Sequence, residues 1–385
     1  MFLEIAFWLC LALVVYVYAG YPACAWLLAL VLRRDVRKAD IEPRVAVITS
    51  AFNEEREIER TILNKLSQDY PADRLEVIVV SDGSTDRTDE IVQGLAARAE
   101  GRLRLLRQEP RGGKTQALNM ATSRTTADVV VFADANSIYA PSTVRSLVRN
   151  FSDPSVGYAT GRMVYTNPAR TAVGEGSGSY MSYENLLRGL ETRLGSIVGV
   201  DGGVDAIRRE LYAPMRPDQL PDFVLPLTVV ERGKRVVYDP DAVVYEPALS
   251  DATEEFRMRV RVSLRALWAL YDMRHLLDPL RFPLFAWQLL SHKVLRYLAF
   301  LPLAGLLVFN ALVYFRHGTY GEFLVLQAAA YALAAVGCVF RRSGAGVSRL
   351  LAPYYFVVLN LACVVACWKF LGGQKMVVWN PRKGT

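Results

Sequence analysis

Three short runs rich in β-branched residues, each followed directly by polar residues, constrain the fold of this chain most strongly. The runs are residues 45–51, 77–80 and 129–133, and the polar residues that follow them are Asn53, Glu54, Asp82, Asp134 and Asn136. Such runs are typical of buried strands that end where the polar residues begin. Side chains at the carboxyl ends of neighbouring parallel strands converge on one crevice. The pattern therefore predicts an acidic crevice suited to a metal ion, a ribose or a proton acceptor.

Helical patterns alternate with these runs. They cover Ile58–Leu66 and Thr85–Ala97, and Asp82, Ser84 or Thr85 is available to cap the second helix. This alternation predicts an α/β domain whose largely parallel sheet is covered by helices. Asp82 therefore has two interpretations, as a helix cap or as a ligand in the crevice.

Apolar runs flank this domain at both ends. The chain is 52% hydrophobic with a formal net charge of +7, which favours a membrane protein with basic cytosolic flanks over a nucleic-acid-binding protein. Residues 2–32 are long enough to span a bilayer and are followed by a basic segment at residues 33–38. A cleavable signal peptide with a site at Ala23–Ala25 is the alternative, but the run is too long for one and lacks a basic leader. We expect an uncleaved anchor with the domain in the cytosol.

Three further spans are expected, at residues 294–315, 323–340 and 350–371. An odd number of later spans places the basic C-terminal residues outside, against the positive-inside rule, so the side on which the chain ends stays open. Residues 256–277 have the pattern of an amphipathic helix, and residues 282–297 are too polar for a span and are predicted to lie in the membrane interface. All five cysteines fall in apolar runs, which indicates neither a disulfide framework nor a zinc site.

A basic glycine-rich loop lies between the second and third runs. Gly112 and Gly113 let a ligand approach the backbone, and Lys114 adds positive charge at a helix start, where the helix dipole favours an anion. The loop lacks the upstream glycine of a Walker motif, and a diphosphate is its natural partner. Asp134 and Asn136 offer oxygen ligands on one side of an extended segment, which suits Mg²⁺ or Mn²⁺ bridged to phosphates. A simple turn after a buried strand is the alternative for this pair.

In this order, the motifs resemble the nucleotide-sugar site of membrane-bound family-2 glycosyltransferases, the group that includes cellulose, chitin and hyaluronan synthases and bacterial exopolysaccharide enzymes. The resemblance covers nearly the whole chain. It implies that the uridine end of the donor is held by Ala51, Asn53, Glu54 and Asp82, and that Lys114 lies beside the diphosphate. It also implies that Asp134 is the first acid of the family's Asp-x-Asp metal motif, with Asn136 in place of the second.

The resemblance extends to the acceptor side of the site. Residues 183–191 and 200–209 resemble the segments that border the acceptor sugar, and Gly202 and Gly203 suit close approach of a sugar ring. Asp222 keeps the position of the general base, which takes the proton from the attacking hydroxyl, although Pro221 replaces the acid before it. Capping of the following helix by Asp222 is compatible with that role.

The family's Gln-x-x-Arg-Trp motif has an altered counterpart here. Arg259 and Arg261 lie in the matching stretch, and Arg261 keeps the arginine that is implied to meet the departing diphosphate. Met258 and Val262 replace the glutamine and the tryptophan. Because the tryptophan helps to form the acceptor platform of processive synthases, sugar transfer is the firmer expectation and processive synthesis the weaker one.

The resemblance implies a fold and a division of the chain. The expected fold is a GT-A domain, α/β and Rossmann-like with a mostly parallel sheet, plus transmembrane helices. The expected divisions are an N-terminal anchor at residues 1–38, the GT-A domain at 39–252, amphipathic and interface helices at 253–297, and a three-helix membrane region at 298–385.

The implied activity is inverting, Mg²⁺- or Mn²⁺-dependent transfer from a nucleotide-sugar, with a UDP-sugar as the expected donor, to a saccharide or lipid-linked acceptor. It would serve exopolysaccharide or cell-surface glycan synthesis at the cytoplasmic face of the inner membrane, in a multi-pass protein with membrane lipids and an oligomeric or export partner around it. No nucleic-acid partner is expected. The alternative is a non-catalytic membrane scaffold or secretion partner, which Asn136, Pro221 and the altered arginine motif would explain.

Overall fold

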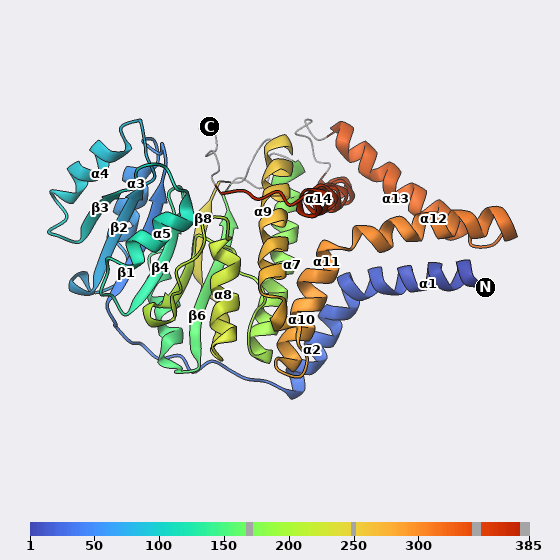
Figure 1. Cartoon of the computed structure of the whole chain (residues 1–385), viewed down its shortest axis with the longest axis horizontal. Helices are drawn as coiled ribbons and strands as arrows, with labels where there is room; N and C mark the ends of the chain where they lie inside the picture. The colour runs from blue at the N-terminus through green and yellow to red at the C-terminus, as the bar shows by residue number, and fades with distance from the viewer. Residues whose placement is uncertain (167–171, 248–251, 341–347, 378–385) are drawn as a thin grey trace. The chain divides into compact units, whose positions relative to one another are not determined.

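The computed structural model describes residues 1–166, 172–247, 252–340 and 348–377, and its chain forms two compact units (Figure 1). The helical unit comprises Met1–Val31, Tyr165–Leu187 and Pro247–Gln374. The sheet unit comprises Leu32–Val164 and Arg188–Glu246, together with residues 375–377. Each unit is therefore assembled from segments that are far apart in the sequence.

The sheet unit is built on an eight-stranded sheet in the order β3-β2-β1-β4-β7-β6-β8-β5. The strands are β1 (Val45–Ala51), β2 (Leu75–Ser81), β3 (Leu103–Arg107), β4 (Val129–Asp134), β5 (Ile138–Tyr139), β6 (Val156–Tyr165), β7 (Asp205–Arg208) and β8 (Arg235–Glu246). The first four strands in this order are parallel, with Ala51 opposite Ser81 and Ser50 opposite Asp134. The carboxyl ends of β1, β2 and β4 therefore lie at one edge, as the sequence predicts.

The other half of the sheet is less parallel than expected. β7 pairs antiparallel with β4 and β6 antiparallel with β7, while β5 pairs antiparallel with β8. The antiparallel direction has a consequence for the crevice. Because Asp205 at the start of β7 lies opposite Phe132 near the end of β4, the residues that precede β7 arrive at the same edge as Asp134.

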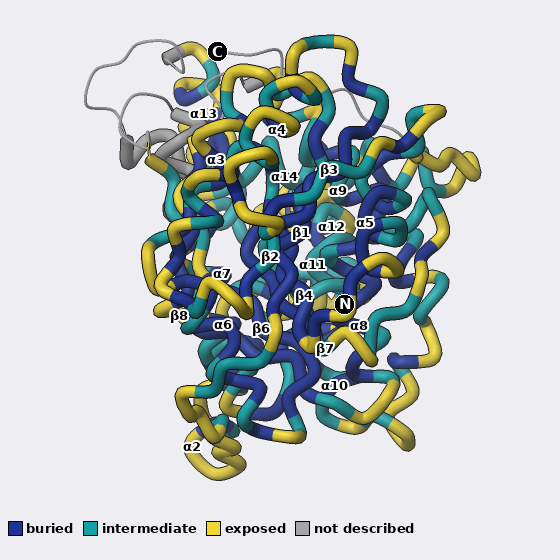
Figure 2. Tube along the Cα trace, turned by 90° about the vertical axis from the view of Figure 1, so that its left-hand side faces the viewer, coloured by how far each residue is buried: buried dark blue, intermediate teal, exposed yellow. Residues whose placement is uncertain are grey.

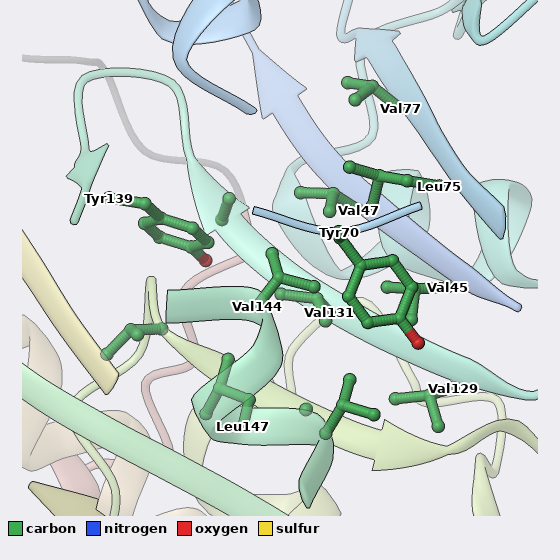
Figure 3. Close-up of a cluster of buried hydrophobic side chains, with 14 of the residues drawn as sticks. Val45, Val47, Tyr70, Leu75, Val77, Val129, Val131, Tyr139, Val144 and Leu147 are labelled. Atoms are coloured by element: carbon green, nitrogen blue, oxygen red, sulfur yellow. The ribbon is translucent and has the colours of Figure 1, made fainter. Parts of the chain in front are cut away.

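The core of this unit lies where helices cover the sheet. Alternate residues of β1, β2 and β4, including Val47, Val77 and Val131, are buried together with side chains of the covering helices (Figure 3). The strands are buried along most of their length (Figure 2). The helices of the unit are α3 (Ile58–Leu66), α4 (Thr88–Ala96), α5 (Lys114–Thr122), α6 (Thr143–Val148) and α8 (Pro221–Glu231).

The predicted start of α4 was wrong. The helix begins at Thr88 rather than Thr85, and none of Asp82, Ser84 or Thr85 caps it. Asp86 Oδ1 accepts hydrogen bonds from the Thr88 amide at 3.0 Å and from the Thr88 hydroxyl at 2.6 Å, and this local turn delays the helix. Asp82 therefore does not cap α4, which leaves its interpretation as a residue of the crevice.

Among its described residues, the helical unit contains four helical stretches that are long and apolar enough to cross a membrane. They are Phe2–Val31, Phe300–His317, Gly321–Val339 and Pro353–Leu371. The helices of the unit are α1 (Phe2–Val15), α2 (Tyr21–Val31), α9 (Ala252–Asp272), α10 (Pro283–Leu289), α11 (Leu295–Tyr297), α12 (Phe300–His317), α13 (Gly321–Phe340) and α14 (Ser348–Leu371), while α7 (Ala172–Leu194) is shared by both units. The four expected apolar helices are thus present.

Two helix boundaries in this unit differ from expectation, and at one of them charged side chains bind a buried glutamate. The second span begins at Phe300 rather than residue 294, since the preceding turn directs charged side chains to Glu184. Glu184 is buried and accepts from Arg296, with Lys293 at 3.5 Å. Burial alone would raise the pKa of Glu184, but Lys293 and Arg296 hold it well below its usual range. The amphipathic helix α9 begins at Ala252 rather than residue 256 and ends at Asp272.

Candidate active site

One end of the crevice is formed by two turns that are tied together. After β1, Asn53 adopts a left-handed conformation with φ 55°, and its Oδ1 accepts a hydrogen bond from the Thr85 amide at 2.8 Å. The Glu54 amide donates to the Thr88 hydroxyl at 2.9 Å, and the Ala51 carbonyl accepts from the Asp82 amide at 2.8 Å. The turns after β1 and β2 therefore form one preorganised wall. Ala51, Asn53, Glu54 and Asp82, predicted from the sequence, all lie in it.

Asp82 holds the glycine-rich loop. Its carboxylate accepts from the amides of Gly112 at 2.8 Å and Gly113 at 3.0 Å, and from Gln108 Nε2 at 2.5 Å. Arg111 adds a weaker contact at 3.3 Å, and its guanidinium stacks 3.4 Å from the centre of the Phe52 ring. Backbone amides donating to a buried carboxylate form charge-assisted bonds. The loop that carries Lys114 is therefore fixed in place by the aspartate of the neighbouring strand.

Lys114 connects this wall to the acids of the second half of the crevice. It is the first residue of α5, and its Nζ lies 2.8 Å from Asp134 Oδ1 and 3.5 Å from Asp222 Oδ1. Burial would lower the pKa of Lys114, but Asp134 and Asp222 raise it above its usual range. The lysine is therefore firmly charged and lies between the two acids that the sequence assigned to the metal and to the proton.

Two glycines make room for those acids. Gly202 and Gly203 have φ values of +73° and +77°, in the region that favours glycine. A Cβ added at Gly202 would lie 2.6 Å from Asp222 Oδ2, and one added at Gly203 would lie 3.2 Å from Asp134 Oδ2. The backbone before β7 thus runs directly against both carboxylates, and the structure brings Gly202 and Gly203 to the same place as Lys114, Asp134 and Asp222.

Helix α3 holds the segment that carries Asp134 and Asn136. Thr61 donates to the Ala135 carbonyl at 2.7 Å, and Lys65 Nζ donates to the Ser137 carbonyl at 2.6 Å. Lys65 is fully buried, and burial lowers its pKa to about 7. No sequence signal marked Lys65, because a lysine on a helix is ordinarily exposed.

The residues Asp134 and Asn136 fit a divalent metal that takes its remaining ligands from a substrate. The Asp134 side chain is 37% exposed, and Asn136 follows it after the end of β4. In the described part of the chain, no group of three or more His, Cys, Asp or Glu residues is placed to hold a metal. One carboxylate and one amide with open space suit Mg²⁺ or Mn²⁺ bridged to phosphates better than a closed site.

Asp205 is a buried acid of the crevice to which sequence reasoning gave no role. It is 0% exposed, and among the described residues neither carboxylate oxygen has a hydrogen bond of good geometry, although the hydroxyls of Tyr158 and Thr160 lie near enough to interact with it. Burial raises its pKa well above the usual range, and the nearby Asp222 charge adds to the effect. The available signal was an acid inside the apolar run Val204–Ile207, where an ordinary strand would carry none.

The predicted arginines belong to the other compact unit of the chain. Arg259 and Arg261 lie on α9 in the helical unit. There Arg259 Nε donates to Glu255 at 2.8 Å, and its Nη2 donates to the Tyr355 hydroxyl at 2.7 Å. Arg259 therefore has acidic and phenolic partners within its own unit.

Comparisons with known proteins agree on one family. The family model described as "Glycosyl transferase family 2" matches residues 46–214. An N-acetylglucosaminyltransferase of Bradyrhizobium elkanii is 33% identical over 142 residues, which cover 36% of this chain and 78% of that protein. A beta-monoglucosyldiacylglycerol synthase of Synechocystis sp. is 31% identical over 170 residues, which cover 44% of this chain and 35% of that protein. The chain spans about half or less of the length of the first curated relatives it matches.

A solved structure shares the fold. The mannosyltransferase PcManGT from Pyrobaculum calidifontis, in complex with GDP-Man and Mn²⁺, superposes with a TM-score of 0.73 at 23% identity. The match covers 96% of this chain and 99% of that one. The predicted GT-A fold is thus confirmed, with a mixed sheet.

Proposed function

Because this chain belongs to glycosyl transferase family 2, as its motifs predicted, we propose that it transfers a sugar from a nucleotide-sugar to a hydroxyl of an acceptor. One observation carries the proposal. Lys114 lies between Asp134 and Asp222, at 2.8 Å and 3.5 Å, and both carboxylates are partly exposed, at 37% and 25%. A cation, an acid that can bind a metal and a carboxylate base within one crevice match the needs of glycosyl transfer to a hydroxyl.

Asp222 is the proposed general base. It is the second residue of α8, its side chain is 25% exposed, and its Oδ2 lies so close to Gly202 that a Cβ there would be 2.6 Å away. Asp222 takes the proton of the acceptor hydroxyl as that oxygen attacks the anomeric carbon from the face opposite the nucleotide. The bond from the anomeric carbon to the diphosphate oxygen breaks, and the configuration at that carbon inverts. No protein nucleophile is needed for this displacement.

Lys114, Asp134 and Asn136 are proposed to handle the charge of the leaving diphosphate. Mg²⁺ or Mn²⁺ held by Asp134 and Asn136 would supply further positive charge there when bound. Lys114 exchanges its carboxylate partners for phosphate oxygens, with its position fixed by the loop that Asp82 anchors. Arg259 and Arg261 of α9 are proposed to meet the same diphosphate.

The wall formed by the turns after β1 and β2 is proposed to hold the nucleoside. Ala51, Asn53, Glu54 and Asp82 are its members, and a UDP-sugar is the proposed donor. The Asp82 carboxylate already accepts from several donors of the loop, so it acts on the nucleoside mainly by fixing the Arg111 side chain and the Gly112 backbone. Gly202 and Gly203 are proposed to border the acceptor sugar.

The proposed acceptor is a saccharide or a lipid-linked saccharide at the cytoplasmic face of the membrane. Relatives at 24–31% identity include both a poly-beta-1,6-N-acetyl-D-glucosamine synthase and glucosyldiacylglycerol synthases, so the names of relatives support either kind. We place the protein as a multi-pass membrane enzyme of exopolysaccharide or cell-surface glycan synthesis. Membrane lipids surround its apolar helices, and an oligomeric or export partner would be required only for polymer secretion.

The test is release of nucleoside diphosphate by the purified full chain. The donor panel contains UDP-glucose, UDP-N-acetylglucosamine and GDP-mannose, each with Mn²⁺, with Mg²⁺ and with a chelator. We expect turnover of one donor that depends on the metal and is lost in Asp134→Ala. Absence of both turnover and donor binding across the panel would reject the proposal and favour a scaffold. Product length, one added sugar or a ladder, then separates single transfer from polymerisation.

A further inference from the structure

A basic cavity lies on the sheet unit, away from the crevice. Its volume is about 390 Å³, and its walls include Arg34, Lys38, Gly189, Arg193 and Tyr238. None of the residues assigned to sugar transfer lines it. The cavity is formed where the segment after the N-terminal apolar helix meets the last turns of α7 and strand β8.

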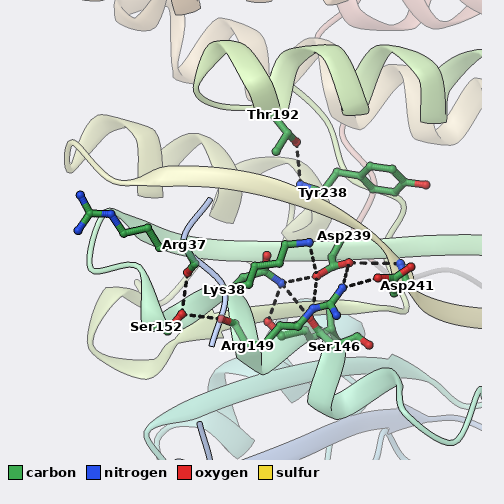
Figure 4. A network of polar contacts seen from close by, with 11 residues as sticks. Arg37, Lys38, Ser146, Arg149, Ser152, Thr192, Tyr238, Asp239 and Asp241 are labelled. Atoms are coloured by element: carbon green, nitrogen blue, oxygen red, sulfur yellow. Dashed lines mark hydrogen bonds and ion pairs between the residues drawn. The ribbon is translucent and has the colours of Figure 1, made fainter. Parts of the chain in front are cut away.

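The segment that forms one wall is pinned to the unit by backbone contacts. The Arg34 amide donates to the Arg193 carbonyl at 2.7 Å, and the Arg37 carbonyl accepts from the Ser152 hydroxyl at 2.6 Å. Lys38 Nζ pairs with Asp239 at 2.9 Å (Figure 4). On the opposite wall the Tyr238 amide donates to the Thr192 hydroxyl at 2.9 Å, which fixes β8 to α7 (Figure 4). The walls of the cavity are therefore fixed by hydrogen bonds and an ion pair.

The charges in this cavity are unbalanced. The guanidinium groups of Arg34 and Arg193 have no hydrogen-bonded or ion-paired partner among the residues that the structure describes. Asp35 also lines the cavity, but its carboxylate is already paired with Arg33, whose Nε lies 2.9 Å from Oδ1 and 2.8 Å from Oδ2. Behind the wall, burial lowers the pKa of Arg235 and the positive charge of Arg34 lowers it further. The cavity is thus lined by two unpaired guanidinium groups, and the positive charge of one of them, Arg34, also disfavours the charged form of Arg235.

Along the chain, Arg34 comes shortly after an apolar helix. Arg34 follows Val31, the last residue of α2, by only three positions. An extended chain advances at most about 3.6 Å per residue, so Arg34 lies within roughly 11 Å of the helix end. If that helix crosses a bilayer, its end lies among lipid headgroups, and the inner surface of the bilayer is negatively charged.

We propose that the cavity lined by Arg34, Gly189 and Arg193 binds the phosphate of an anionic membrane phospholipid. Guanidinium groups bind phosphate oxygens with paired, charge-assisted hydrogen bonds. The open wall at Gly189, where an added Cβ would meet nothing within 4 Å, leaves room for the glycerol part of the headgroup. Lipid bound there would anchor the sheet unit to the membrane surface, independently of sugar transfer.

Gly189 provides a sharp test. It lies in a helix with ordinary φ, and a Cβ added there meets nothing within 4 Å. Gly189→Leu therefore places bulk in the cavity while raising helix propensity, so it should block the site without unfolding the protein. Arg34→Gln and Arg193→Gln remove the charges. The matched control is Arg98→Gln, the same charge change at an exposed residue beside β3, at the other edge of the sheet.

Binding is measured on the full chain in neutral detergent by native mass spectrometry, with dioctanoyl phosphatidylglycerol, dioctanoyl phosphatidylcholine and inorganic phosphate as probes. We expect phosphatidylglycerol to bind best and each arginine variant to weaken it about tenfold. Gly189→Leu should abolish that binding, and Arg98→Gln should leave it unchanged. Equal phosphatidylglycerol binding by wild type and Gly189→Leu would overturn the site. Inorganic phosphate binding as tightly as the lipid would overturn the lipid assignment.

Discussion

The two halves of the crevice treat buried aspartates in opposite ways. Asp82, in the parallel half, is 3% exposed and accepts hydrogen bonds from two backbone amides and a glutamine. Asp205, in the antiparallel half, is 0% exposed, and within the described part of the chain its oxygens accept no hydrogen bond of good geometry, with the Tyr158 and Thr160 hydroxyls as weaker neighbours. A buried aspartate thus has well-formed hydrogen bonds in one half and lacks them in the other.

This difference in hydrogen bonding indicates a different role for each half of the crevice. The half that we assign to the nucleoside is preorganised, because Asn53 ties its turn to the turn after β2 and the Asp82 carboxylate holds the glycine-rich loop. The half that we assign to transfer is left electrostatically incomplete. Lys114 contacts Asp134 and Asp222, and its charge also acts on Asp205, so one lysine serves three acids and a bound cation or a substrate proton completes this half.

The largest effect should come from removing the proposed base. Asp222→Asn keeps the shape of the side chain but cannot accept the proton, so the turnover number should fall by ~10²–10⁴-fold. Donor affinity should change little, because the nucleoside wall and loop are held by Asp82. Turnover is measured by nucleoside diphosphate release and donor affinity by calorimetry. Turnover near that of wild type would remove Asp222 from the chemistry.

The next effect tests whether the backbone before β7 sets the position of that base. Gly202→Ala would push a Cβ to 2.6 Å from Asp222 Oδ2, and a displaced catalytic group typically costs on the order of 10²-fold in turnover. The matched control is Gly233→Ala, which has the same φ of +73° but a Cβ that meets nothing within 4 Å. Both variants carry the same backbone strain. An equal loss of activity in the two would mean that strain, not displacement of Asp222, is responsible.

The third prediction tests the satisfied half. Asp82→Asn replaces a carboxylate that accepts from two amides with an amide group that has one acceptor. Hydrogen bonds to charged groups contribute about 1.5–3 kcal/mol, so the free energy of unfolding should fall by an amount in this range. The loop that carries Lys114 should loosen as well, which lowers donor affinity. Calorimetric unfolding and donor titration measure both effects. Unchanged stability would contradict the view that Asp82 holds the loop.

The parallel half could be predicted closely from the sequence. The helix Ile58–Leu66 was placed correctly at both ends, and Lys114 was correctly placed at a helix start, because local patterns and strand-end polar residues determine both. The sequence left Asp82 with two interpretations, and local pattern could not choose between them because its partners, Gln108 and the glycine amides, come from a loop about thirty residues away. A single local pattern carries no information about such partners.

The antiparallel half was predictable only in part. Gly202, Gly203 and Asp222 were found through the family resemblance, and the structure brings them together. The reversal of β7 could not be read from composition, since a strand has the same pattern in either direction. Lys65 and Asp205 were missed for a related reason: their burial depends on which elements pack over them, and polar residues are exposed by default.

The smallest effect should have the opposite sign to that of Asp82→Asn. Burial and the Asp222 charge raise the pKa of Asp205, so the folded protein binds a proton that the unfolded chain releases above its ordinary pKa of about 4. The free energy of unfolding of the wild type therefore falls as the pH rises from about 4 towards the raised pKa. Below pH 4 the titration of Asp205 has no effect on it.

Asp205→Asn removes this titration. The variant should match or exceed wild-type stability at pH 7, by about 1 kcal/mol, and the difference should grow between pH 5 and pH 8. Calorimetric unfolding of the full chain at several pH values measures it, with Asp82→Asn as the comparison. A difference that is constant with pH would show that Asp205 does not titrate in this window. A loss of stability matching that of Asp82→Asn would show that both halves satisfy their acids alike, and the distinction between a prebuilt nucleoside half and an incomplete transfer half would fail.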